Sequence, residues 1–526
     1  MIKKSLLSVI AFVLLLTGCS RPTAAPTEVP PTPTETPAPE SLAVFEPAVC
    51  PFQLPPGQIE GTTVECGYLV VPEKRADPDA GTIRLAVGIF HPPGGATESD
   101  PIIYLAGGPG GSVLELLHLS FEGLYQPIMA VGRDLILFDQ RGVGLSEPAL
   151  DCPDAHELAL ELLDHVRDGE ELSEEEMDVL FGDAYAACAD DLRAVADLTA
   201  YNTVASAADV NDLRLALGYD QVNLWGQSYG TRLALGVLRD YPQGVRSVVL
   251  DSVYPPDVDM YLESPANLDR ALEALFEACA ADAACSAAYP CLRQVFFDTV
   301  ERLNSNPVET VIRDPFTGRI HSALLTGDVY FGLVFQLLYV TEMLPALPQL
   351  ITDVSQGDVE TFNRIRGAVL GQGMAISRGM SFSVQCNEET AFSTVEEFDA
   401  ALADYPELAD FLEGGSLGRA AYVVCTFWGA GQAAEIENEP VTSDIPTLVM
   451  TGEFDPITPP AWGRQAAETL ENSSFYLYPN VGHGAASVAG CPQDMLVAFL
   501  DDPSRPPDDT CIAEMILRFA VPTARR

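Results

Sequence analysis

The stretch Gly226-Gln227-Ser228-Tyr229-Gly230 decides the fold of this 526-residue chain because of the sequence on either side of it. Residues 221–225 (QVNLW) form a short β-type run, and residues 231–238 (TRLALGVL) are apolar with helical spacing. A strand, G-x-S-x-G and a helix form a nucleophile elbow, a strained turn that exposes its serine at the end of a sheet. The glycines are required because a Cβ there would collide with the neighbouring backbone. The pattern predicts Ser228 as a nucleophile and the Tyr229 amide, at the positive end of the helix, as an oxyanion donor.

A serine nucleophile needs a base, and the base needs a carboxylate that orients it. After Ser228 the chain contains only two histidines, His321 and His483. His321 lies in a polar stretch with no strand predicted to lead into it, so a structural role is expected. His483 follows the strand-like run at residues 475–478 and is flanked by glycines, which allow a loop to carry an imidazole over the end of a sheet. His483 is therefore the predicted base.

The carboxylate is expected on the loop that leaves the strand predicted at residues 445–452. Glu453 and Asp455 both qualify by residue type. Pro456 stiffens the loop and favours an extended Asp455, which makes Asp455 the predicted acid. Thr458 is predicted to cap a following helix that has proline at its first position. The alternative for Asp455 is an ordinary solvated turn residue.

A glycine-rich loop, residues 107–112 (GGPGGS), follows the predicted buried strand at residues 101–106. Such a loop brings a backbone amide close to a substrate carbonyl, and Gly108 is predicted as the second oxyanion donor. Phosphate binding is the alternative, but neither Gly-Lys-Ser/Thr nor G-x-G-x-x-G is present there. In the next loop, Asp139 and Arg141 are expected to hold the loop in place rather than to take part in chemistry.

Five segments together resemble the proline iminopeptidase and tripeptidyl aminopeptidase family: GGPGGS, DQRGVGLSEP, WGQSYGTRLAL, TGEFDPITPP and PNVGHG. The tripeptidyl branch, with its long insertion and C-terminal segment, is the more similar, over roughly residues 45–515. The resemblance implies an α/β-hydrolase fold, a mostly parallel sheet flanked by helices, and a serine aminopeptidase without a cofactor. Ala106 stands where proline iminopeptidases usually carry histidine, which weakens the expectation of strict proline iminopeptidase specificity.

The pattern along the chain predicts a hydrolase core in two parts, residues 45–255 and a TAP-like part at residues 441–526. The segment between them, residues 256–440, shows long helical patterns and is expected to form a lid that selects substrates. The resemblance implies that acidic side chains of the lid bind the free N-terminal amine of a peptide. Glu388 and Glu389 are the candidates, and ordinary solvated acids are the alternative.

The N-terminus is predicted to direct export. Residues 1–18 combine a basic start, an apolar run and small residues, which is typical of a secretory signal. Leu-Thr-Gly-Cys resembles a bacterial lipobox, which would make Cys19 a lipidated residue and place the protein outside the cytoplasm, anchored to the cell membrane by that lipid alone. The alternative is an ordinary secretory signal. Residues 19–44 are rich in proline and threonine and are expected to be a tether.

The composition restricts the partners. With 28 basic and 76 acidic residues, a net charge of −48 argues against nucleic acid or anionic lipid bound by electrostatics. The oligomeric state is not indicated. Twelve cysteines fit an oxidising compartment. Proximity suggests the pairs Cys50–Cys66, Cys152–Cys188, Cys386–Cys425 and Cys491–Cys511, with Cys279, Cys285 and Cys291 as a cluster that leaves one thiol over. Because these spacings are not CxxC pairs and no histidine is near, no metal site is expected.

The predicted function is an exported aminopeptidase that releases short N-terminal units, of tripeptidyl or prolyl type, from peptides through a Ser-His-Asp acyl-enzyme mechanism. A carboxylesterase or lipase acting on small esters with the same triad is the alternative. A catalytically silent binding protein is a third possibility, which the complete triad argues against. A dehalogenase or epoxide hydrolase would require an aspartate at position 228.

Overall fold

The computed structural model describes residues 43–522, except residues 78, 315–316, 373–374 and 415–416. The predicted signal, nearly all of the predicted tether and Cys19 lie outside the described residues. Within the described part of the chain, no helix has both the length and the apolar character needed to cross a membrane.

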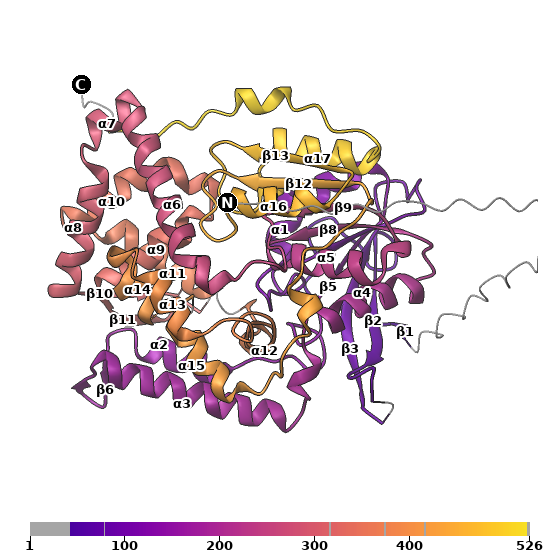
Figure 1. Cartoon of the computed structure of the whole chain (residues 1–526), viewed down its shortest axis with the longest axis horizontal. Helices are drawn as coiled ribbons and strands as arrows, with labels where there is room; N and C mark the ends of the chain where they lie inside the picture. Colours follow the sequence, from indigo (N-terminus) through magenta and orange to yellow (C-terminus); the bar gives the residue numbers. More distant parts are fainter. Residues whose placement is uncertain (1–42, 78, 315–316, 373–374, 415–416, 523–526) are drawn as a thin grey trace, which may run out of the picture. The chain divides into compact units, whose positions relative to one another are not determined.

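A nine-stranded sheet forms the core, in the order β1-β2-β3-β5-β4-β8-β9-β12-β13 (Figure 1). The strands are β1 (Val44–Pro47), β2 (Val64–Pro72), β3 (Thr82–Phe90), β4 (Ile102–Leu105), β5 (Leu135–Phe138), β8 (Val222–Gln227), β9 (Val245–Asp251), β12 (Thr447–Gly452) and β13 (Ser473–Tyr478). From β1 to β5 the neighbouring pairs are antiparallel, and from β5 to β13 they are parallel. This is the mostly parallel α/β sheet that the sequence predicted.

Apolar side chains cover both faces of the sheet. One face packs against α4 (Thr203–Ala216), α5 (Tyr229–Asp240) and part of α16 (Pro460–Thr469). The other packs against η2 (Gln126–Val131) and α17 (Cys491–Asp501). Strands β4, β5 and β12 are buried along their whole length, as expected for parallel strands with helices on both faces.

A third apolar cluster holds together the helical insertion between β9 and β12. Its principal helices are α6 (Met260–Ala281), α8 (Leu292–Ser305), α9 (Gly327–Leu338), α10 (Leu347–Ser355), α11 (Glu360–Gln372), α12 (Arg378–Glu388), α13 (Val395–Leu402) and α15 (Arg419–Trp428). The same cluster includes residues of α2 (Pro153–Glu161) and α3 (Glu174–Arg193). The helical layer is thus built from two separate stretches of the chain, because α3 packs on α12 and α15.

The insertion also carries a two-stranded hairpin, β10 (Val308–Arg313) and β11 (Ile320–Leu325). The prediction that His321 lacks a strand was wrong, because His321 lies in β11 opposite Ile312. Valine and isoleucine on β10 and the isoleucine that begins β11 favour a hairpin over an open polar turn. The structural role expected for His321 agrees with this position.

Five disulfides form among the described residues, and they include all four pairs suggested by proximity: Cys50–Cys66, Cys152–Cys188, Cys386–Cys425 and Cys491–Cys511. In the three-cysteine cluster, Cys279 pairs with Cys285, and Cys291 is an exposed free thiol. Disulfides of this number are typical of proteins from oxidising compartments.

Candidate active site

Ser228 sits at the turn between β8 and α5 with a backbone φ of 56° and ψ of −127°. Such angles are strained for a residue with a side chain and recur at functional sites. The Ser228 N–H donates to the carbonyl of Asp251 at 2.9 Å. A Cβ on Gly230 would collide with the carbonyl oxygen of Leu105. The glycine requirement inferred from the sequence therefore has a direct steric cause.

Asp455 and His483 form a buried pair. His483 Nδ1 lies 2.8 Å from Asp455 Oδ2, and the Asp455 side chain is 0% exposed. Burial alone raises the pKa of Asp455, but His483 and the hydrogen bonds from Thr458 outweigh it and hold the pKa below its usual value. Burial lowers the pKa of His483, and the Asp455 carboxylate more than offsets this, so the pKa of His483 is raised. This arrangement favours an imidazole whose other nitrogen, Nε2, is free to accept a proton.

Ser228 and His483 line one cavity of about 400 Å³, called here the catalytic cavity. The other residues that line it come from the end of β8, the glycine-rich loop, the segment after β9, the helical insertion, and the loop after β12 with the start of α16: Gly107, Gly108, Gln227, Tyr254, Met260, Phe335, Gln336, Tyr339, Ile376, Arg378, Gln385, Leu417, Ile457, Thr458 and Trp462. The Tyr339 ring lies 4.9 Å from the His483 ring. The insertion therefore contributes directly to the walls around the nucleophile, in the position expected of a lid.

The two predicted oxyanion donors belong to segments that adjoin Ser228. Tyr229 is the first residue of α5, which places its amide at the helix N-terminus. Gly108 has a φ of +120°, and a Cβ on the preceding Gly107 would approach Ser228 Cβ to 2.7 Å. Only glycine allows the loop to run this close to the nucleophile.

Asp139 holds its own loop in place, as the sequence predicted, and it also holds the end of the glycine-rich loop through the Ser112 hydroxyl. Its carboxylate accepts hydrogen bonds from the amides of Val113 at 2.8 Å and Leu145 at 2.9 Å. Arg141 instead pairs with Asp209 in α4, where Nε and Oδ2 are 2.7 Å apart. Arg141 thus fixes its own loop to a helix and does not contact the glycine-rich loop.

The structure brings Glu388 and Glu389 to Arg232 rather than to the triad. Their side chains are each 2% exposed, and each carboxylate pairs with the guanidinium, at 3.1 Å and 2.7 Å respectively. Glu388 also accepts from the amide and hydroxyl of Thr203, both at 2.6 Å, and Glu389 from the amide of Met260 at 2.9 Å. Burial raises the pKa of Glu389 to about 7, although Arg232 opposes this shift. Neither glutamate is among the residues that line the catalytic cavity.

Sequence reasoning assigned Thr458 the wrong role. Helix α16 begins at Pro460 with Pro459 as its N-cap, so Thr458 does not cap it. Its hydroxyl donates to Asp455 Oδ2 at 2.7 Å and lies 3.2 Å from His483 Nδ1. The prolines move the helix start one residue further along the chain and leave the hydroxyl free for the carboxylate. Spacing alone does not distinguish a cap from this contact.

Asp251 is a second carboxylate close to His483 that the sequence did not single out. It ends β9 and is fully buried, and its Oδ2 accepts from the amide of Ala486 at 3.1 Å. Its Oδ1 has no hydrogen-bond partner among the described residues. Burial raises the pKa of Asp251 to about 7. Its signal in the sequence was its place at the end of a buried strand, the same kind of position from which Asp455 was chosen.

No group of three or more histidine, cysteine, aspartate or glutamate side chains in the described part of the chain is arranged to hold a metal ion.

Two family models match this chain. Residues 100–282 match the "alpha/beta hydrolase fold" model, and residues 414–511 match the "TAP-like protein" model. The chain is 26% identical to the serine protease Hip1 of Mycobacterium tuberculosis over 462 residues, which cover 84% of this chain and 86% of that protein.

Two further relatives match shorter stretches. The tripeptidyl aminopeptidase of Streptomyces coelicolor is 33% identical over 209 residues, which cover 39% of this chain and 38% of that protein. The proline iminopeptidase of Lactobacillus delbrueckii subsp. bulgaricus is 32% identical over 160 residues, which cover 30% of this chain and 38% of that protein. With its mostly parallel sheet and its serine at the β8–α5 turn, the chain has the α/β-hydrolase fold and carries a TAP-like C-terminal part, and it is similar to a serine protease, a tripeptidyl aminopeptidase and a proline iminopeptidase.

Proposed function

We propose that this protein is an exported serine aminopeptidase that releases short N-terminal units from peptides through an acyl-enzyme. The observation that carries the proposal is the buried Asp455–His483 pair, whose imidazole lines one cavity with Ser228. In this mechanism His483 takes the proton of the Ser228 hydroxyl, the serine attacks the scissile carbonyl, and the amides of Gly108 and Tyr229 stabilise the oxyanion. His483 then returns the proton to the leaving amine, and water releases the acyl group.

The peptide substrate is supported by the relatives, which include a serine protease, a tripeptidyl aminopeptidase and a proline iminopeptidase. The triad by itself serves esters equally well, since both reactions pass through the same acyl-enzyme. A carboxylesterase is therefore the second candidate. The part of the cavity wall that comes from the helical insertion would distinguish an aminopeptidase from an esterase, because it decides which substrates reach Ser228.

Recognition of the substrate amine by Glu388 and Glu389 is part of this proposal as a hypothesis about specificity. The pairing of both carboxylates with Arg232 means that a substrate amine would have to compete with the guanidinium for them. Glu389 is the nearer candidate, because the amide it binds belongs to Met260, which lines the catalytic cavity.

We also propose that Cys19 carries a lipid that anchors the enzyme to the cell membrane outside the cytoplasm. The lipobox-like Leu-Thr-Gly-Cys and the five disulfides support this location. Mass spectrometry of the mature N-terminus tests it. A diacylated Cys19 supports the anchor, and an unmodified terminus at another residue refutes it.

The decisive experiment on function compares aminoacyl, dipeptidyl and tripeptidyl amides with short-chain esters on the purified enzyme. We expect free-amine peptide amides to give the highest kcat/KM. Each substrate is also tested with an N-acetyl group, because an aminopeptidase loses activity when the amine is blocked. A preference for esters would favour an esterase instead of an aminopeptidase. A preference for N-acetylated peptides would favour an endopeptidase.

A further inference from the structure

A second cavity of about 420 Å³ adjoins the catalytic cavity. Five residues line both: Gly108, Ile376, Arg378, Gln385 and Leu417. The second cavity is bounded on its other sides by α3, α12 and α15, through residues such as Phe181, Tyr185, Phe382 and Val424. Because Gly108 belongs to the predicted oxyanion hole, the shared wall begins beside the reacting carbonyl. The two cavities together offer room for a substrate longer than one residue.

Arg378 occupies the boundary between the cavities and is held there by its neighbours. It is the first residue of α12 and directly follows a segment bonded to the glycine-rich loop. The Ser112 amide donates to the Ala375 carbonyl at 3.0 Å, and the Ser377 amide to the Gly110 carbonyl at 2.8 Å. The start of α12 is therefore fixed to the loop that carries the predicted oxyanion donor.

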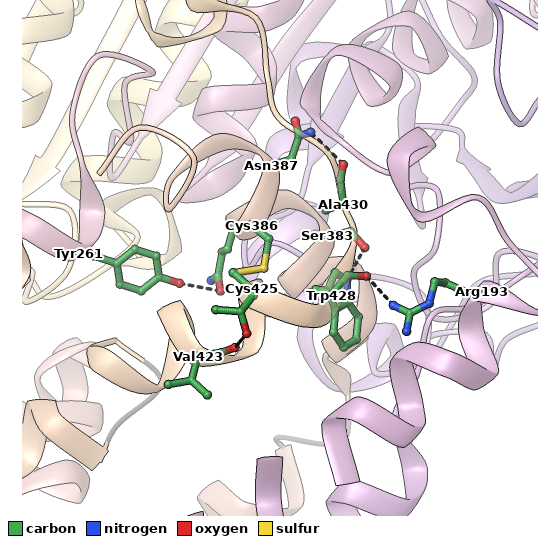
Figure 2. Close-up of a disulfide and its surroundings, with 11 residues drawn as sticks. Arg193, Tyr261, Ser383, Cys386, Asn387, Val423, Cys425, Trp428 and Ala430 are labelled. Carbon is green, nitrogen blue, oxygen red and sulfur yellow. Dashed lines mark hydrogen bonds between the residues drawn. A yellow bond between two sulfur atoms is a disulfide. The ribbon is translucent and has the colours of Figure 1, made fainter. Parts of the chain in front are cut away.

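Helix α12 is anchored along the rest of its length as well (Figure 2). The Cys386–Cys425 disulfide joins it to α15, and Ser383 accepts from the Trp428 indole N–H at 3.0 Å. The Tyr261 hydroxyl donates to the Gln385 side chain at 2.9 Å. Arg378 thus projects from a rigid element, which is what precise recognition of a charged group requires.

Arg378 is a cation without a partner. It is partly buried, and among the described residues it has no hydrogen bond, ion pair or ring contact, whereas Arg419, which also lines the second cavity, pairs with Asp399. The acids that line the second cavity, Asp178 and Glu413, form no ion pair with Arg378. Arg378 is the one arginine, lysine, aspartate or glutamate among the described residues that line the catalytic cavity.

The position of Arg378 is electrostatically unfavourable in the free protein. The N-terminus of an α-helix carries a partial positive charge, which repels a cation and attracts an anion. In a chain with 76 acidic residues, an arginine left unpaired at such a point requires an explanation. An anionic group of the substrate would give Arg378 the partner that it lacks and would offset the positive charge at the helix N-terminus. Arginine suits this role because it binds carboxylates through two parallel hydrogen bonds.

We propose that Arg378 binds a carboxylate of the substrate and that the second cavity holds the part of the substrate next to it. The proposal rests on the proposed function, in which the site cleaves peptides. The carboxylate has two sources in a peptide: an aspartate or glutamate side chain, or the C-terminus of a short peptide. Arg378 is a specificity-determining residue in this proposal, and the chemical step remains with Ser228 and His483.

The test uses the full purified enzyme and three pairs of substrates. The first pair is a set of tripeptidyl amides with glutamate or glutamine at each position in turn, and the second is short peptides with a free or amidated C-terminus. The third is mono-4-nitrophenyl glutarate and 4-nitrophenyl pentanoate, which differ in one carboxylate and need no peptidase activity. The variants are Arg378→Gln, Arg378→Lys and, as a matched control, Arg319→Gln, whose arginine is exposed and lies outside both cavities.

We expect the wild type to prefer the carboxylate member of at least one pair by roughly 10- to 100-fold in kcat/KM, and Arg378→Gln to abolish that preference. Arg378→Lys should retain part of it, because lysine keeps the charge but not the paired geometry. The first two pairs identify the source of the carboxylate. Arg319→Gln should behave as the wild type.

Two results would overturn the proposal: a wild type with no carboxylate preference in any pair, or an Arg378→Gln variant that loses activity equally on both members of each pair. Failure of the proposed function gives a different result. In that case the peptides are not cleaved, while the 4-nitrophenyl esters still report whether Arg378 selects a carboxylate. Labelling of Ser228 by a fluorophosphonate shows in every variant that the nucleophile is intact.

Discussion

The backbone N–H of Ser228 donates to the carbonyl oxygen of Asp251 at 2.9 Å, so the strained turn of the nucleophile is held by the end of the neighbouring strand. The Asp251 side chain also lies near His483, and it accepts a hydrogen bond from the amide of Ala486 in the loop that follows the histidine. One residue at the end of β9 therefore connects the nucleophile's turn with the segment that carries the predicted base.

Replacing Ser228 with alanine should lower kcat by a factor of about 10⁴ or more on every substrate, because the nucleophile is removed while the fold is kept. His483→Ala should behave similarly. Initial rates and circular dichroism on the purified variants check this. His321→Ala is the control and should retain activity, since His321 lies in the β10–β11 hairpin. If His321→Ala is inactive and His483→Ala keeps its activity, His483 is not the base.

The pH dependence of kcat/KM should follow the neutral form of His483. The pKa of His483 is raised above its ordinary value of 6.5, and the imidazole accepts a proton only when it is neutral. Activity should therefore rise with pH through a pKa above 6.5 and level off beyond it. Asp455→Asn removes the carboxylate that raises the pKa of His483. The acid limb of the pH profile should therefore move to lower pH, while kcat falls by about 10⁴. If the acid limb does not move in that variant, the pH dependence of kcat/KM does not arise from the Asp455–His483 pair.

Thr458→Val should lower kcat by roughly 10- to 100-fold, because the hydroxyl that donates to the buried Asp455 carboxylate is lost. The acid limb of the pH profile should shift as well, which a purely structural role would not cause. Thr458→Ser keeps the donor and should retain most of the activity. A serine variant that loses as much activity as the valine variant would contradict the role given to the hydroxyl, because serine keeps it.

Asp251→Asn should stabilise the protein in alkaline solution. Burial raises the pKa of Asp251 from 3.8 to about 7, so the folded state favours the protonated carboxyl. Its contribution to stability is complete below pH 3.8 and is lost as the pH rises to about 7. Asparagine stays neutral throughout, so the variant should gain a few kcal/mol over the wild type at pH 8 and much less at pH 5. Urea unfolding at both pH values measures this, with the exposed Asp298→Asn as a control.

Glu388→Gln should destabilise the fold by about 3–5 kcal/mol, because breaking a buried ion pair leaves Arg232 partly uncompensated. Glu389→Gln should cost less, because burial already raises the pKa of Glu389 to about 7 and so disfavours its charged form. Kinetics on matched free-amine and N-acetyl substrates then test amine recognition. If kcat/KM changes equally for both substrates, the role of these two glutamates is structural. A loss of roughly 30- to 150-fold confined to the free-amine substrate would establish a contact with the amine.

The motifs around Ser228, Asp455 and His483 were predictable because each depends on local rules. Glycines at fixed offsets identify the turn, and a polar residue directly after a buried strand identifies a position at the edge of the sheet. The disulfides were predictable by proximity because most cysteines had one close partner in the sequence. His321 was misplaced because hairpin pairing of β10 with β11 depends on both arms at once.

The sequence by itself determined the fold class, the nucleophile's turn and the order of the predicted triad, since strand, turn and helix signals act over a few residues. Only the tertiary structure decided which charges meet. Glu388 and Glu389 have the same local sequence whether they face a cavity or Arg232, and Thr458 has the same spacing whether it caps a helix or binds Asp455. Arg378 is likewise one arginine among many until α12 fixes it at the boundary of two cavities without a partner. Side-chain pairing depends on which distant segments share a buried space, and that information arises only when the chain packs.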